Sequence, residues 1–252
     1  MNTYFNIKYE LNKKQVHQSI DSVIRQGQKG YICVADGVVM NTANRYQEYL
    51  DVVNGGLFAI CDSGWVPLYL KSIYGIKYEQ YCGADIFKDV VSSRKYRMIF
   101  MGTRQSTLDA LQEKLMDMNP DVKDMKFVEL PFRDVGDFDY KGIARMIEDD
   151  GAEIIWVALG APKQERFMNR LLPYLKSGVM LGVGAVFKFY SGTNESRCPE
   201  WIQKHHMEFL YRIYQDPRKQ LKRCFWIVLT LPKLYFGELK KKWLSTSQVV
   251  PT

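Results

Sequence analysis

Twelve consecutive residues carry the clearest structural signal of the chain: Ile154-Ile155-Trp156-Val157-Ala158-Leu159-Gly160-Ala161-Pro162-Lys163-Gln164-Glu165. The first six are apolar without interruption, as in a strand that is buried on both faces of a sheet. Gly160 then ends the strand, and Pro162 suits the first turn of a following helix, where its missing N–H costs nothing. The sequence therefore predicts a strand, a loop and a helix over residues 154–170.

The same pattern continues along the chain, because short apolar runs alternate with segments of helical periodicity. Further strands are predicted at residues 31–34, 57–61, 97–101, 126–130 and 179–183. Helices are predicted at residues 12–26, 42–53, 106–118, 140–150 and 162–172. This alternation predicts a Rossmann-like α/β fold, with a largely parallel sheet flanked by helices.

Two parts are expected, an α/β domain over residues 1–198 and a helical, basic C-terminal appendage over residues 199–252. The appendage begins with a predicted helix at residues 199–215, and the composition changes at Pro217. Residues 218–252 hold eight basic residues against one acidic residue, Glu238, so their net charge of +7 equals that of the whole chain. The basic character of the protein therefore belongs to its tail.

The tail also contains apolar and aromatic residues. The apolar run at residues 224–231 is too short to cross a bilayer and is followed by Tyr235, Phe236 and Trp243. Aromatic and basic residues in this mixture are typical of segments that bind the surface of anionic membranes. A helix that covers the core or forms a homo-oligomer has the same pattern, and both alternatives stay open. No nucleic-acid-binding motif is present, so nucleic acid is not an expected partner.

The chain lacks the features of exported proteins. No apolar run reaches the roughly 18 to 20 residues of a membrane-spanning helix, and the N-terminal residues do not resemble a signal peptide. The cysteines are scattered and include no Cys-x-x-Cys pair, which argues against a disulfide framework. They are Cys33, Cys61, Cys82, Cys198 and Cys224. We therefore expect a cytoplasmic protein with reduced thiols.

Metal and cofactor sites are not indicated. Asp137 and Asp139 form an Asp-x-Asp pair, but they lie in a polar stretch before a helix, where acids usually act as caps. His205 and His206 are adjacent on a predicted helix and point in different directions, and His17 stands alone. We expect neither a metal nor a cofactor.

In open α/β sheets, ligands bind outside the carboxyl ends of the strands. At that edge, Lys163 and Gln164 would lie beside free backbone N–H groups at a helix N-terminus, which is an anion-binding arrangement. An ordinary strand-to-helix turn explains the same pattern. Asp62 follows the strand at residues 57–61 and is either a general base or the N-cap of a helix that begins near Trp65. Asp36 presents the same choice.

The segment at residues 102–106 joins a strand to a helix. It could hold a phosphate through its backbone N–H groups, the Arg104 guanidinium and hydroxyl groups such as that of Thr103. It lacks the glycine spacing of a Walker loop or a dinucleotide fingerprint, so taken alone the signal is weak.

The ordered blocks of the chain resemble the WecG/TagA/CpsF family of bacterial glycosyltransferases, glycosyltransferase family 26. The strongest block is residues 156–165, which matches the signature loop of that family without a break. Further blocks are residues 61–64, 83–85, 182–187 and 199–218, and the resemblance covers residues 4–236.

This resemblance implies transfer of N-acetylmannosamine or another hexose from a UDP-sugar to a polyprenyl-diphosphate-linked saccharide, with inversion and without a required metal. Residues 1–198 would be the catalytic domain, and the appendage would hold it peripherally on the inner face of the cell membrane. Asp62 becomes the base that deprotonates the acceptor, and Gln164 supports the transition state. The expected substrate contacts are Asp36, Gly64, Asp85, Gly102, Thr103, Arg104, Gly160, Lys163, Glu165 and Gly184. The expected contacts to the acceptor diphosphate or the membrane are Arg212, Arg218 and Arg223.

Some positions depart from the family pattern. Val34-Ala35-Asp36 stands where Thr-Pro-Asn is common, Gln80 replaces an arginine, and Lys188 replaces the aspartate of a Phe-Asp-Phe element. These differences surround the expected sugar pocket and leave the donor sugar open. The alternative function is a non-catalytic nucleotide-sugar or lipid-surface binding protein of the same fold.

Overall fold

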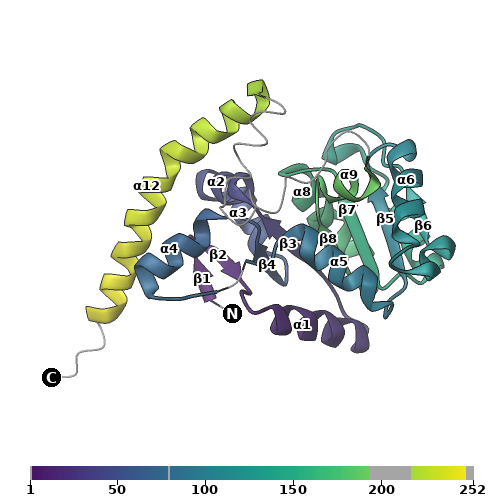
Figure 1. The fold of residues 1–252 in the computed structure, drawn as a ribbon, viewed down its shortest axis with the longest axis horizontal. Helices are drawn as coiled ribbons and strands as arrows, with labels where there is room; N and C mark the ends of the chain where they lie inside the picture. Colours follow the sequence, from purple (N-terminus) through teal and green to yellow (C-terminus); the bar gives the residue numbers. More distant parts are fainter. Residues whose placement is uncertain (1, 79, 193–216, 248–252) are drawn as a thin grey trace.

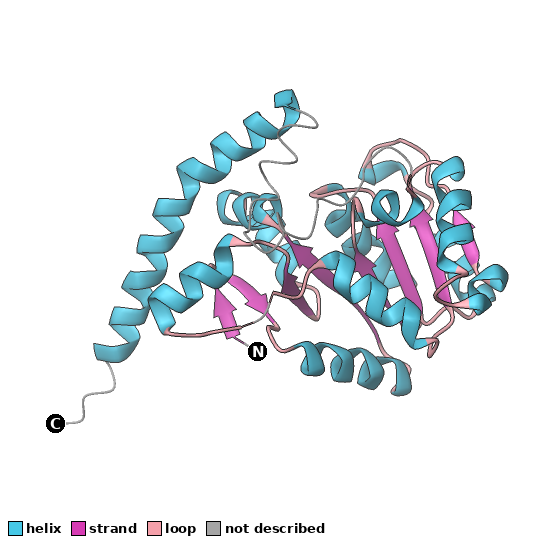
Figure 2. Cartoon of the chain, viewed as in Figure 1, coloured by secondary structure: helices cyan, strands magenta, loops and turns pink. Residues whose placement is uncertain are grey.

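The computed structural model describes residues 2–78, 80–192 and 217–247, without the side chains of residues 217–224, 226–228 and 245–247. The described chain folds around one eight-stranded sheet with helices on both faces (Figures 1 and 2). In spatial order the strands are β1 (Asn2–Tyr4), β2 (Ile7–Tyr9), β4 (Phe58–Cys61), β3 (Lys29–Ala35), β8 (Gly178–Gly182), β7 (Ile154–Ala158), β5 (Met98–Gly102) and β6 (Lys126–Val128). All neighbouring pairs are parallel except β1 and β2. The predicted α/β fold class is confirmed.

Strand β7 shows why the sheet lies at the centre of the molecule. Its residues are fully or nearly fully buried, and successive side chains enter opposite cores. Trp156 packs against Phe87 in one core, whereas Ile155 and Val157 belong to the other. An apolar strand with this alternation must be covered on both faces, as its sequence predicts.

The helices form a layer on each face. One layer consists of α2 (Gly37–Arg45), α3 (Gln47–Asn54), α4 (Trp65–Tyr74), α7 (Tyr140–Asp150) and α8 (Lys163–Leu171). The opposite layer consists of α1 (Lys13–Arg25), α5 (Gly83–Ser93), α6 (Gln105–Leu115) and α9 (Val186–Ser191). Short 3₁₀ turns lie at η1 (Pro120–Asp124), η2 (Val135–Asp137) and η3 (Leu172–Tyr174). The helices after β3 and β8, after β8 and β7, and after β7 and β5 lie on opposite faces of the sheet. In open α/β sheets, ligands are expected outside the carboxyl edge at such points.

Some predicted boundaries were wrong. The helix predicted at residues 42–53 is two helices, α2 and α3, because Tyr46 has an extended backbone between them. The strand predicted at residues 126–130 ends at Val128. The hairpin of β1 and β2 was not predicted, since its strands are only three residues long. The helix predicted at residues 199–215 lies outside the described residues.

A long helix, α12 (Pro217–Ser247), packs along one side of the domain beside α2 and α4 (Figure 1). Leu231 is buried in this contact, and Thr230 forms a hydrogen bond with Asn41 of α2. Glu238 is 2% exposed and accepts hydrogen bonds from the Phe5 N–H (3.1 Å) and the Tyr74 hydroxyl (3.0 Å). The helix is therefore docked by polar as well as apolar contacts.

Candidate active site

The expected site residues follow five adjacent strands at one edge of the sheet. Asp62 follows β4, Asp36 follows β3, Gly184 follows β8, Gly160 follows β7, and Gly102 ends β5. Parallel strands present their carboxyl ends at the same edge, and neighbouring strands lie about 4.8 Å apart. The topology thus gathers segments that are far apart in the sequence into one row.

Asp62 contacts the beginning of α5. Its Oδ1 accepts a hydrogen bond of 3.1 Å from the Gly83 N–H, the first residue of that helix. Gly83 packs closely on the sheet, because a Cβ placed there would lie 3.0 Å from Val34 and 3.6 Å from Val186. Through this contact with Gly83, the Asp62 carboxylate lies near the end of β3 and the start of α9. The N-cap position of α4 is Gly64 rather than Asp62.

Asp36 and Asp85 act as caps in the structure. Asp36 Oδ1 accepts hydrogen bonds of 2.9 Å from the N–H groups of Val38 and Val39 and so caps α2. Asp85 Oδ2 accepts from the Cys82 thiol at 2.9 Å and from the Cys82 N–H at 3.4 Å, which forms a capping box on α5. Both carboxylates were expected to contact substrate. In the structure, both accept hydrogen bonds from groups at the start of their own helix.

The loop after β5 is strained. Gly102 and Thr103 both have positive φ angles, of 115° and 54°. At Gly102 a side chain is excluded, because its Cβ would lie 2.6 Å from the carbonyl oxygen of Ala158. The first N–H of α6, that of Gln105, donates to Glu129 Oε2 at 2.9 Å. The phosphate site expected at residues 102–106 therefore has a carboxylate at its helix N-terminus, and sequence reasoning missed Glu129.

The loop between β7 and α8 differs from the expected anion site. The N–H groups of Lys163 and Gln164 both donate to the Gly160 carbonyl oxygen at 3.0 Å, so neither is the free donor that the sequence suggested. Gly160 has a φ of 75°, the Ala161–Pro162 peptide bond is cis, and Pro162 is the N-cap rather than the first helical residue. The first N–H groups of α8 are therefore bonded to the preceding loop.

The side chain of Gln164 folds back into the site. Its Oε1 accepts from the Gly160 N–H at 3.1 Å, and its Nε2 donates to Glu165 Oε1 at 2.9 Å. The amide lies against the end of β8, since a Cβ at Gly182 would be 3.1 Å from it and one at Gly184 would be 3.6 Å from Oε1. The Gln164 amide thus lies between the carboxyl ends of β7 and β8.

Glu165 lies behind Gln164 rather than in the cleft. It is 0% exposed, and its Oε2 accepts a hydrogen bond of 2.9 Å from the hydroxyl of Tyr49 on α3. Burial raises the pKa of Glu165 to about 7, while hydrogen bonds from Gln164, the backbone and Tyr49 lower it and the Asp36 charge raises it. In this structure the Glu165 carboxylate is directed to Gln164 and Tyr49 within the core.

The basic candidates are distributed unevenly. Lys163 lies 5.0 Å from the ring of Phe132 and 5.5 Å from that of Phe138, beside the same edge of the sheet. Arg104 is exposed at the start of α6. Arg218 and Arg223 belong to α12, but their side chains are not described, and Arg212 lies outside the described residues.

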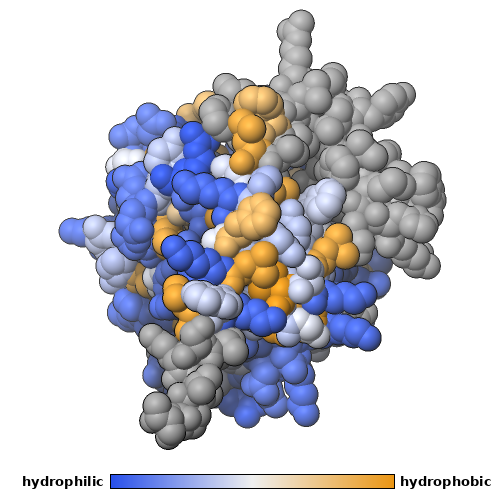
Figure 3. Space-filling view, turned by 90° about the vertical axis from the view of Figure 1, so that its left-hand side faces the viewer, coloured by the Kyte–Doolittle hydropathy of each residue, from blue (hydrophilic) through white to orange (hydrophobic). Residues whose placement is uncertain are grey.

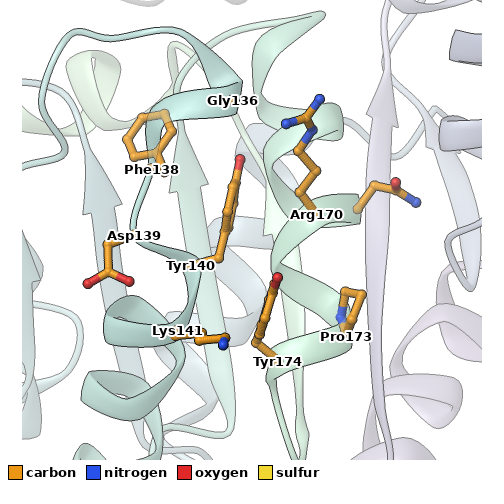
Figure 4. A pocket seen from close by; sticks show the side chains of 9 residues that line it. Gly136, Phe138, Asp139, Tyr140, Lys141, Arg170, Pro173 and Tyr174 are labelled. Atoms are coloured by element: carbon orange, nitrogen blue, oxygen red, sulfur yellow. The ribbon is translucent and has the colours of Figure 1, made fainter.

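A separate pocket of about 620 Å³ lies between α7 and α8 (Figure 4). The stacked rings of Tyr140 and Tyr174 line it, with Arg170 above them. Arg170 is six residues beyond Gln164, which is about 9 Å along a helix. The pocket contains none of the expected site residues.

The outward face of α12 carries large apolar side chains. Phe225, Leu229, Phe236 and Trp243 are between 55% and 69% exposed. They are four, seven and seven residues apart, which places them on one face of the helix, near the exposed Lys233 and Lys240. Apolar side chains lie among hydrophilic ones on this side of the molecule (Figure 3). In the described part of α12, as in the other described helices, no segment is long and apolar enough to cross a membrane.

Among the residues that the structure describes, no three His, Cys, Asp or Glu side chains group in a way that could hold a metal ion.

A polar cluster lies between α1 and α5 and consists of Lys13, His17, Tyr81 and Asp89. It lies on an outer face and supports the segment that leads to Gly83.

Residues 3–248 match the model of the Glycosyl transferase WecG/TagA/CpsF family. The chain is 24% identical over 251 residues to the N-acetylglucosaminyldiphosphoundecaprenol N-acetyl-beta-D-mannosaminyltransferase of Bacillus subtilis (strain 168), over 95% of this chain and 91% of that protein. A protein of the same name from Bacillus spizizenii (strain ATCC 23059 / NRRL B-14472 / W23) is 24% identical over 219 residues, 85% of this chain and 80% of its own. Another from Staphylococcus aureus (strain MW2) is 22% identical over 192 residues, 74% and 72% of the two chains. With a family match over nearly its whole length, the chain belongs to the Glycosyl transferase WecG/TagA/CpsF family.

Proposed function

We propose that this glycosyltransferase moves N-acetylmannosamine or another hexose from a UDP-sugar to a polyprenyl-diphosphate-linked saccharide, with inversion, during synthesis of a cell-surface polysaccharide. The acceptor class is supported by the three relatives, whose names specify N-acetylglucosaminyldiphosphoundecaprenol. The observation that carries the proposal is the position of Asp62, a carboxylate that follows β4 at the carboxyl edge of the sheet, next to β3, and contacts the start of α5.

Asp62 is the proposed general base. The Gly83 N–H at the N-terminus of α5 stabilises its ionised form and fixes one of its oxygens. The Asp62 carboxylate takes the proton of the acceptor hydroxyl as that hydroxyl attacks the anomeric carbon. The bond between that carbon and the UDP oxygen breaks with its electron pair leaving on the diphosphate, so a single displacement inverts the sugar carbon.

The leaving diphosphate needs positive charge, and side chains are the better candidates for supplying it. The first N–H groups of α2, α6 and α8 already donate within the protein. We therefore assign the diphosphate to Arg104 and Lys163 on the domain, with Arg212, Arg218 and Arg223 as candidates from the appendage. Gln164, between β7 and β8, is proposed to support the transition state.

The outward face of α12 is proposed to bind the inner surface of the cell membrane. Its exposed aromatic side chains suit the interfacial region of a bilayer, and nearby lysines suit anionic lipid headgroups. Lys241 and Lys242 instead turn toward the protein, where they contact Asn6, Glu238 and the carbonyl oxygen of Ile73. Apolar side chains therefore carry more of this proposed attachment than the sequence suggested.

The test is release of UDP from a panel of UDP-sugars in the presence of a polyprenyl-diphosphate-linked N-acetylglucosamine, with mass spectrometry of the product. Asp62→Asn should lower kcat by about 10²- to 10⁴-fold, because it cannot accept the proton. Asp117→Asn is the matched control, since Asp117 is exposed and lies away from the edge. Full activity of Asp62→Asn would remove the base role, and binding of UDP-sugars without product would contradict the transferase proposal.

A further inference from the structure

The hydrogen bonds around Gln164 leave little freedom to its amide group. A primary amide can donate two hydrogen bonds from nitrogen and accept two at oxygen. In the structure Oε1 accepts from the Gly160 N–H, and one N–H of Nε2 donates to Glu165. One N–H and one lone pair of the amide remain. Gln164 is 3% exposed and lies at the carboxyl ends of β7 and β8, where the proposed function places the substrate.

Both partners of Gln164 are needed to fix its orientation. If the amide were turned by half a rotation, Nε2 would face the Gly160 N–H and Oε1 would face the Glu165 carboxylate. The first contact would bring two donors together and the second two acceptors. An ionised Glu165 therefore excludes the reversed amide.

Glu165 is in turn held from the opposite side by Tyr49. The hydroxyl of Tyr49 donates to Glu165 Oε2, and both residues are 0% exposed. Tyr49 lies on α3 and Glu165 on α8, so the contact joins two helices of the same layer. The carboxylate cannot rotate away from Gln164 without losing this bond in the buried core, where an unpaired acceptor is costly.

We propose that Glu165 is a positioning residue whose buried carboxylate, anchored by Tyr49, fixes the Gln164 amide in the orientation that presents an N–H to the substrate. The inference rests on the proposed function, because Gln164 supports the transition state there. It extends that proposal because the orientation of the Gln164 amide is then fixed by two buried residues, Glu165 and Tyr49.

The surroundings make this arrangement sensitive to pH. On β3, Tyr31 and Cys33 face Glu165, and burial raises their pKa values, as it does that of Tyr49, so all three stay neutral near pH 7. Asp36 is the charged neighbour, and it raises the pKa of Glu165 in addition to the effect of burial. On α8 itself, Arg166 lies against Glu48 and the Tyr49 ring, and Lys163 lies by Phe132.

Protonation of Glu165 would release Gln164. A proton on Oε1 would point at the N–H that Gln164 donates, whereas a proton on Oε2 would compete with the Tyr49 hydroxyl. In either case one of the two hydrogen bonds is lost or reversed. The reversed amide of Gln164 is then no longer excluded, and its N–H no longer faces the substrate.

The test follows the side-chain amide of Gln164 by ¹⁵N NMR against pH, with the resonance assigned by its loss in Gln164→Leu. In the wild-type protein its chemical shift should titrate with a midpoint near the Glu165 pKa of about 7. Tyr49→Phe should move the midpoint upward by about half a pH unit or more, because the ionised carboxylate loses a donor. Glu165→Gln should abolish the titration.

Tyr140→Phe is the matched control. Like Tyr49→Phe, this substitution removes one tyrosine hydroxyl that donates a hydrogen bond, in this case to the carbonyl oxygen of Val135. The Tyr140 ring packs against Phe167 of α8, the helix that carries Glu165. The midpoint of this variant should equal that of the wild-type protein. An absent titration in the wild-type protein, or equal midpoints in the two tyrosine variants, would overturn the proposal.

Kinetics separate this inference from the function on which it rests. Glu165→Gln should lower kcat about tenfold with little change in the KM for the donor, because the lost interaction belongs to the transition state. In a plot of kcat against pH, Tyr49→Phe should shift the acid limb to higher pH, by the same amount as the NMR midpoint. If the amide titrates as expected but no UDP-sugar is turned over, the positioning role holds and the proposed function fails.

Discussion

The Asp62 carboxylate accepts a hydrogen bond of 3.1 Å from the Gly83 N–H, which joins the end of β4 to the start of α5. The proposed base role of this carboxylate can therefore be separated from its observed role as an acceptor at the start of α5. Substitutions at residue 62 can distinguish them, because an amide keeps an acceptor oxygen but cannot serve as the base.

Asp62→Asn should keep the thermal stability of the wild-type protein, whereas Asp62→Ala should lower the free energy of unfolding by about 1 kcal/mol through loss of the acceptor. Both variants should lose activity. Thermal unfolding and UDP release, measured on the same preparations, check this prediction. Equal stability of the Ala and Asn variants would show that the Gly83 contact contributes little.

Glu165 should make stability fall as pH rises. Its pKa is raised from an ordinary value of 4.5 to about 7, so between these values the native protein holds a proton that the unfolded chain releases. The free energy of unfolding should therefore decrease by about 3 kcal/mol from about pH 4 to about pH 8, relative to Glu165→Gln. Urea unfolding of both proteins at several pH values measures the difference, and parallel curves would contradict the buried carboxyl.

Two glycines should respond to alanine in opposite ways. At Gly102 the backbone has a φ of 115° and a Cβ would lie 2.6 Å from the Ala158 carbonyl oxygen, so Gly102→Ala should cost about 3 kcal/mol and displace the loop before α6. At Gly237, inside α12, nothing lies within 4 Å of a Cβ. Gly237→Ala should stabilise the helix by up to about 1 kcal/mol. Chemical denaturation gives both values, and a tolerated Gly102→Ala would show that the loop can shift without cost.

Glu238 should decide whether α12 stays docked. Its carboxylate is 2% exposed and accepts hydrogen bonds from Phe5, Tyr74 and Lys241, so Glu238→Ala removes the acceptor of all three donors. The expected cost is about 2 to 3 kcal/mol, with faster proteolysis within α12. Glu113→Ala, at an exposed position of α6, is the control and should leave both properties unchanged. Equal proteolysis of the two variants would show that apolar contacts alone hold the helix.

Phe236 and Trp243 should carry membrane attachment. They are 66% and 69% exposed on the outward face of α12, so the double alanine variant should lose most binding to vesicles that contain phosphatidylglycerol. The control replaces Met116 and Tyr174, exposed residues elsewhere on the domain, with alanine. Sedimentation with vesicles at low and high salt gives the readout. Binding that persists in the Phe236 and Trp243 variant would contradict the proposed membrane face.

The sequence by itself determined the strand and helix around Gly160 and the parallel α/β architecture. It could do so because a strand buried on both faces, a glycine stop and a helical repeat are local patterns. It also placed Asp62, Asp36 and Gln164 at the carboxyl edge, because that follows from strand order and direction alone.

Only the tertiary structure decided what each polar group contacts. The Phe5-Asn6 turn has φ angles of 51° and 64°, and Phe5 donates its N–H to Glu238, which is 233 residues away along the chain. Asp62 accepts a hydrogen bond from the Gly83 N–H at the start of α5, and Glu165 accepts one from Tyr49 of α3. A hydrogen bond depends on distances of a few tenths of an ångström between groups that packing brings together, and the periodicity of a sequence does not record those distances.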